Sequence, residues 1–164
     1  MMLLLGLGST VLVFAQASSE YTSDISQFNK AKDLFLRKQY TAAQYEFQQF
    51  YEACADPNQE LCVQANYYMA YCAMELYHPD AENLVVEFIT ENPTSPLVNT
   101  AKFDLAKHFF QRKKYRDAKN WFEKVDAFLL PLDQQQEYHF KLGYGYFQDD
   151  NYRSAMQHLS LIHI

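Results

Sequence analysis

The stretch Leu105-Ala106-Lys107-His108-Phe109 returns 37 residues later as Leu142-Gly143-Tyr144-Gly145-Tyr146. Each copy is followed at equal distances by a tyrosine, an alanine and a large apolar residue, which are Tyr115, Ala118 and Phe122 in one and Tyr152, Ala155 and Leu159 in the other. A fixed period of this length indicates a helix-turn-helix unit stacked on copies of itself. Such stacks present an extended concave face, so the pattern favours partner binding over catalysis.

The same template finds two earlier units with the same order of small, apolar and proline positions. Their positions are Ala31, Leu34, Tyr40, Ala43, Phe47, Phe50 and Pro57 in the first unit, and Tyr67 to Leu76, Ala81, Val85, Phe88 and Pro93 in the second. The inner turn of the second unit, residues 77–80, lacks the usual tyrosine and is one residue shorter. The alternative, an ordinary helical domain with an accidental period, is disfavoured because four coincident registers rarely arise by chance.

The order Leu-Gly-x-x-Tyr at Leu142 to Tyr146, followed by the alanine at Ala155, resembles the tetratricopeptide repeat. The tryptophan of that family's pattern is replaced, by Lys102 in one unit and His139 in the next. The turn Asn92 to Pro96 is similar to those of bacterial periplasmic tetratricopeptide proteins. The resemblance covers residues from about Asp24 onward and implies an all-α fold, an α-solenoid of about four antiparallel helix pairs in a right-handed superhelix.

Eight helices follow from this register, and small residues are expected where they cross. Their predicted ranges are 24–37, 41–55, 61–76, 80–91, 96–111, 115–128, 134–148 and 152–162. Gly143 and Gly145 lie inside a predicted helix, where we expect them to serve close packing. Pro96 is predicted to begin its helix, because proline is tolerated in the first turn.

The N-terminal residues 1–17 are predicted to be a secretory signal peptide. The apolar run of residues 3–14 is shorter than the roughly 20 residues that cross a bilayer, and Ala15-Gln16-Ala17 provides small residues for a signal peptidase. An uncleaved anchor is the less favoured alternative. Residues 18–164 then form the repeat domain, whose end at 159–164 lacks a polar cap and predicts truncation of a longer array. We expect an exported protein of the Gram-negative periplasm that meets membranes only through partners.

Composition argues against several classes of function. The net charge is −6 and the isoelectric point is about 5.3, which disfavours nucleic acid as a partner. The basic run Gln111 to Arg116 is interpreted as a solvated turn near a helix C-terminus. The five histidines have no short metal-ligand spacing, and no nucleophile elbow or phosphate-binding glycine loop occurs. We therefore expect no metal, no cofactor and no enzymatic activity.

Three cysteines, Cys54, Cys62 and Cys72, leave one thiol unpaired if a disulfide forms in an oxidising compartment. Cys54 and Cys62 flank the turn between the first two units, so a bridge between them is geometrically allowed. Cys62 and Cys72 are separated by ten residues of helix, or about 15 Å, and cannot pair. The alternative of three buried thiols remains open at this point.

Aromatic residues repeat seven positions apart on the first helix of each unit, so each pair shares one helix face. With the residues between them, they make up the predicted partner-binding groove: Phe28, Lys32, Phe35, Tyr67, Tyr71, Met74, Phe103, Lys107, Phe110, Phe140, Tyr144 and Phe147. The competing interpretation is that these rings form core between neighbouring first helices. Partial exposure of Phe103 and Phe110 would favour the groove, and complete burial of both would exclude it.

The sequence thus predicts an exported scaffold that binds a protein or peptide, in an extended or helical form with apolar anchors and some acidic character. The alternative is that these repeats are the N-terminal sensory or docking segment of a larger catalytic or signalling envelope protein.

Overall fold

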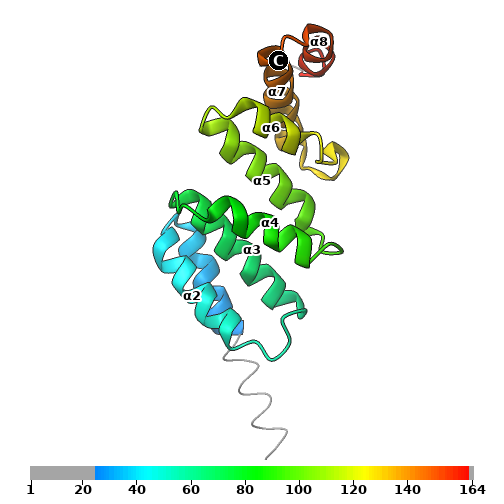
Figure 1. Ribbon diagram of the computed structural model, residues 1–164. Coiled ribbons are helices and arrows are strands. Elements are labelled where there is room, and N and C mark those ends of the chain that lie inside the picture. The colour runs from blue at the N-terminus through cyan, green and yellow to red at the C-terminus, as the bar shows by residue number, and fades with distance from the viewer. Residues whose placement is uncertain (1–24, 163–164) are drawn as a thin grey trace, which may run out of the picture.

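The computed structural model describes residues 25–162, and that part of the chain is helical with no strand. Helical residues 25–36 are followed by α2 (Tyr40–Glu52), α3 (Glu60–Glu75), α4 (Ala81–Glu91), α5 (Leu97–Gln111), α6 (Tyr115–Phe122), the 3₁₀ turn η1 (Ala127–Leu129), α7 (Leu132–Gln148) and α8 (Tyr152–Leu159). Figure 1 shows the helices stacked in chain order, each packed on the next, with α2 and α8 at opposite ends of the stack. The predicted all-α fold is confirmed, whereas the signal peptide lies outside the described residues.

All four helix pairs are joined by the same turn. Its central residue has a left-handed backbone, with φ between 57° and 59° at Lys38, Tyr77, Lys113 and Asp150. In the third pair the amide of Lys113 donates to the Phe110 carbonyl and that of Lys114 to the Phe109 carbonyl, both at 3.0 Å. Equivalent bonds occur in the other three turns, and this arrangement satisfies the last carbonyl groups of each first helix.

The turn in the second unit is one residue shorter, as the sequence predicts. In the third unit the amide of Ala118 donates to the carbonyl of Lys114, four residues back, at 2.9 Å. In the second unit the equivalent alanine, Ala81, donates to the carbonyl of His78, only three residues back, at 3.2 Å. The hydrogen bond in the second unit thus spans one residue fewer, which compensates for the shorter turn. The following helix therefore packs in the same position as in the other units.

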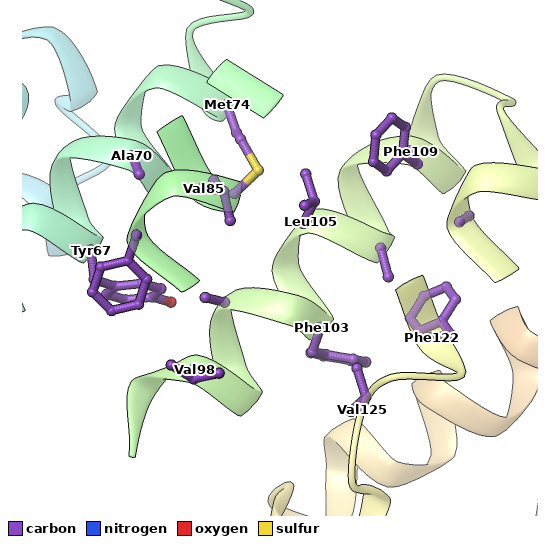
Figure 2. Close-up of a cluster of buried hydrophobic side chains, with 14 of the residues drawn as sticks. Tyr67, Ala70, Met74, Val85, Val98, Phe103, Leu105, Phe109, Phe122 and Val125 are labelled. Carbon is purple, nitrogen blue, oxygen red and sulfur yellow. The ribbon is translucent and has the colours of Figure 1, made fainter. Parts of the chain in front are cut away.

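The core forms two adjoining clusters of buried side chains. The smaller one includes Phe28 and Phe47 of the first pair and one face of α3 from Cys62 to Cys72, and the larger one runs from α3 to α7. The ring of Tyr68 packs against both clusters. Figure 2 shows the larger cluster, in which side chains of α3, α4, α5 and α6 fill the space between the helices. The core is therefore continuous along the stack.

Two glycines of α7 allow close helix approach, in agreement with the expectation from sequence. A Cβ at Gly143 would come within 2.9 Å of Leu159 Cγ on α8. A Cβ at Gly145 would come within 3.0 Å of Lys119 Cβ on α6. These two residues let α7 pack closely on both neighbours.

One predicted helix is too long. The range 115–128 was expected to be a single helix, but α6 ends at Phe122 and a turn leads into η1. Asn99 of α5 fixes this turn, because its side-chain amide donates to the Asp126 carbonyl at 2.9 Å and accepts from the Asp126 amide at 2.8 Å. The Asp126 carboxylate then caps η1 by accepting from the Phe128 amide. The hydrogen bonds to Asn99 and the cap on η1 stabilise the turn more than the backbone hydrogen bonds of a longer α6 would.

A search of residues 25–162 for a bilayer-spanning helix finds none with the necessary length and apolar character.

Candidate functional site

The seven-residue aromatic pairs on the first helices differ in exposure. Phe28, Tyr67 and Phe103, the first members in three units, expose 3%, 7% and 0% of their surface. Met74, the second member in the second unit, exposes 4%. Four predicted groove residues therefore belong to the core, and their assignment to a partner-binding surface is wrong.

These side chains are buried because each lies between its own second helix and the next unit. The ring of Phe28 packs edge-on against Phe47 of α2, with centroids 5.6 Å apart, and also faces Tyr68 of α3. The ring of Phe103 packs against Phe122 of α6 at 5.9 Å, and Figure 2 places both in the buried cluster. The period of the sequence puts these rings on one face, but the next unit covers that face.

The remaining positions of the stripe are accessible to different degrees. Lys32, Phe35, Tyr71, Lys107, Phe110 and Tyr144 are partly buried. Phe140 and Phe147 of the last unit are 49% and 50% exposed. Partial exposure of both Phe103 and Phe110 was expected to favour the groove. Phe110 is partly exposed, whereas Phe103 is completely buried, so only one of the two residues agrees with a groove.

The most exposed rings of the stripe, Phe140 and Phe147, lie toward the C-terminal end of the stack, where other rings contact them. We call this group the aromatic surface, and it comprises Phe110, Tyr115, Phe140, Tyr144, Phe147 and Tyr152, contributed by α5, α6, α7 and α8. Phe110, Tyr115 and Tyr144 form a triangle of edge-to-face pairs with centroids 5.0 to 5.5 Å apart. Phe147 continues the surface to Tyr152 at 5.7 Å, and Tyr152 is 56% exposed. The predicted groove did not include Tyr115 and Tyr152, because it was built from the first helix of each unit and these two residues begin second helices.

Two lysines beside these rings, Lys107 and Lys141, each form an ion pair within the chain. Lys107 Nζ lies 2.9 Å from a carboxylate oxygen of Asp104 and 4.7 Å from the ring centroid of Phe103. Lys141 Nζ lies 3.0 Å from a carboxylate oxygen of Glu137 and 4.9 Å from the ring centroid of Phe110. Each charge is balanced within the chain, so Lys107 contributes little attraction for an acidic partner.

A buried polar group links the second and third units. The hydroxyl of Tyr67 on α3 donates to Asp104 on α5 over 2.6 Å. Burial raises the pKa of Asp104, and the nearby Lys107 ammonium and the Tyr67 hydroxyl oppose that rise. A cavity of about 40 Å³ beside it is lined by Tyr71, Met74, Glu75, Asp104, Lys107, His108 and Gln111. This volume has room for a few water molecules at most.

The structure joins Cys54 and Cys62 by a disulfide, with Cα atoms 6.3 Å apart. Cys72 is a free, buried thiol whose pKa burial raises to about 12, with Glu75 adding to the rise. The bridge closes the loop between α2 and α3, which is distant in sequence from the aromatic surface. Its role is therefore to hold the first two units together.

Two further features of the described residues lie outside the aromatic surface. A cavity of about 300 Å³ lies among the loops at the ends of α3, α4 and α5, lined by Asn58, Glu60, Val63, Gln64, Glu91, Asn92, Thr94, Ser95, Pro96 and Leu97. Within residues 25–162, no three histidine, cysteine or carboxylate side chains are grouped to hold a metal ion. None of the residues that line this cavity belongs to the aromatic surface.

Comparison with protein-family models and with curated protein sequences gives no match to this chain.

Proposed function

We propose that the chain is a tetratricopeptide-type scaffold, without enzymatic activity, that binds a protein or peptide through the aromatic surface. The observation that carries the proposal is the half exposure of Phe140, Phe147 and Tyr152 on one continuous surface. Large rings that are held rigidly and left open to solvent are typical anchors of protein interfaces. The repeated helix pairs supply the rigid frame.

The partner should bind mainly through apolar side chains. Lys107 and Lys141 are each neutralised by a neighbouring carboxylate, so the acidic character first expected of the partner has little support from them. The edge-to-face packing of Phe110, Tyr115 and Tyr144 holds the rings in place without a partner. Binding would then cost little ordering of side chains.

Substitution of the exposed rings tests the site without damage to the core. A double variant, Phe140→Ala with Phe147→Ala, removes two half-exposed anchors. The matched control is Phe128→Ala, because Phe128 is 93% exposed and lies on η1, outside the aromatic surface. Phe103 is unsuitable, since its replacement by alanine would leave a cavity and cost about 3–5 kcal/mol.

The measurement is capture of envelope proteins on the immobilised chain, followed by mass spectrometry, with helicity checked by circular dichroism. We expect the parent and the Phe128→Ala variant to retain the same partner, and the double variant to lose it with unchanged helicity. Equal capture by all three would show that the aromatic surface is not the site.

Export to the periplasm is part of the proposal and rests on the apolar run and the Ala15-Gln16-Ala17 motif. N-terminal sequencing of the secreted chain should begin at Ser18. Recovery of protein that still begins at Met1 would contradict export by a cleaved signal.

A further inference from the structure

Two histidines, 19 residues apart in sequence, meet between α7 and α8. His139 Nδ1 and His158 Nδ1 are 3.1 Å apart, and the ring centroids are 5.4 Å apart. The centroid distance exceeds the nitrogen distance by about two ring radii. The two Nδ1 atoms therefore lie between the rings and face each other. This arrangement is a hydrogen bond in which one Nδ1 carries the proton and the other accepts it.

The number of protons on the pair decides whether this bond exists. With both rings neutral, one tautomer donates and the other accepts. One added proton goes to the outer nitrogen of the donor ring and leaves a charge-assisted bond. A second added proton places a hydrogen on each of the facing nitrogens, so two donors and two positive charges confront each other.

The surroundings do not offset that second charge. Tyr146 of α7 stacks on His158 at 5.6 Å, and Tyr138 packs edge-on against His139 at 5.1 Å. Both tyrosines remain uncharged near neutral pH. The carboxylate of Glu123, the residue after α6, accepts a hydrogen bond from the hydroxyl of Tyr146 at 2.8 Å. Burial lowers the pKa of both histidines, and the neighbouring His139 lowers that of His158 further.

We propose that the His139–His158 hydrogen bond is an acid-sensitive contact that keeps α8 packed on α7 and releases it when both rings are protonated. The close crossing at Gly143 brings the two helices near enough for the contact. Because the ring pair of Phe147 and Tyr152 also spans α7 and α8, release would alter one end of the aromatic surface.

The direction of the pH effect follows from the lowered pKa values. The packed form resists the second proton, whereas the released form accepts it with the ordinary histidine pKa of about 6.5. The contact therefore contributes fully to packing above that pH, and its contribution declines as the pH falls below it. One additional proton on release changes the opening equilibrium by up to about ten-fold per pH unit.

Hydrogen exchange of the backbone amides in α8, corrected for the intrinsic effect of pH, measures this opening directly. It should be followed from pH 7.5 to 5.0 in buffer containing EDTA. The test variant is His139→Asn, because an asparagine amide nitrogen takes the place of Nδ1 and does not titrate. The matched control is His78→Asn, since His78 is exposed in the turn before α4.

We expect the parent and His78→Asn to lose up to about ten-fold in α8 protection between pH 6.5 and 5.5, while α5 stays protected. His139→Asn should show no such step. The proposal is overturned if the parent keeps its α8 protection down to pH 5.0, or if His139→Asn shows the same step as the parent. Release of α8 by EDTA at pH 7.5 would also overturn it, because a metal ion would then join the rings.

Discussion

At the scale of single residues, the cysteines show how a local constraint acts on the whole stack. The Cys54–Cys62 bridge closes a loop of nine residues between the first two units. A covalent link of this kind stabilises mainly by restricting the unfolded chain. The buried thiol of Cys72 has its pKa raised to about 12, so it is a poor nucleophile and does not compete for the bridge.

Removal of the bridge should be measurable in the melting temperature. We expect Cys54→Ser with Cys62→Ser to destabilise the oxidised protein by about 2–3 kcal/mol, the loop-entropy value for so short a loop. Reduction of the parent should bring its melting temperature down to that of the double variant. Peptide mapping without reduction offers a separate check, and alkylation of both thiols in the exported protein would contradict the assignment.

At the scale of the elements, two opposing effects act on the glycines of α7. Alanine in place of a glycine favours a helix by about 1 kcal/mol. At Gly145, however, the new methyl group would come within 3.0 Å of Lys119 Cβ and 3.6 Å of Lys119 Cα. Those atoms are close to the backbone, so α6 itself has to move. Overpacking of this kind costs about 1–3 kcal/mol, which outweighs the gain in helix propensity.

We therefore expect Gly145→Ala to lower stability by up to about 2 kcal/mol in urea unfolding followed by circular dichroism. Gln136→Ala on the exposed side of α7 serves as the control and should leave the midpoint nearly unchanged. A Gly145→Ala variant as stable as the parent would show that α6 and α7 have room to separate.

At the scale of the whole molecule, stability depends on the contacts between neighbouring units. A stack of this type gains much of its stability at the boundaries between units. The hydrogen bond from Tyr67 to Asp104 crosses the boundary between the second and third units and is buried. It holds a carboxylate whose pKa burial raises, so loss of the donor leaves a costly buried charge.

Tyr67→Phe should consequently cost about 1.5–3 kcal/mol, the range for hydrogen bonds to charged groups. It should also broaden the urea transition, because the two halves of the stack become less coupled. Tyr68→Phe is a matched control on the adjacent residue, whose hydroxyl has no hydrogen bond to another described residue. Equal losses in the two variants would indicate that packing of the rings, and not the bond to Asp104, joins the units.

The sequence alone predicts the helical fold, the order of the pairs and the position of the turn inside each pair. Apolar and small residues recur with the helical period, and that information is local to each unit. It correctly placed Ala118 and Gly143 at helix crossings, where both are buried. It also found the shortened turn at residues 77–80, because the missing residue shifts Ala81 relative to the helix before it.

The exposure of equivalent rings, in contrast, depends on how the units pack together. Phe103 and Phe140 occupy the same place in their units, yet one is buried and the other is 49% exposed. The difference arises because the cover over each ring comes from the following helices, so exposure is a property of the stack and not of the repeat. The contact between His139 and His158 is another example, because it depends on the distance and crossing angle between α7 and α8. The spacing of the two histidines in the sequence does not predict that distance or angle.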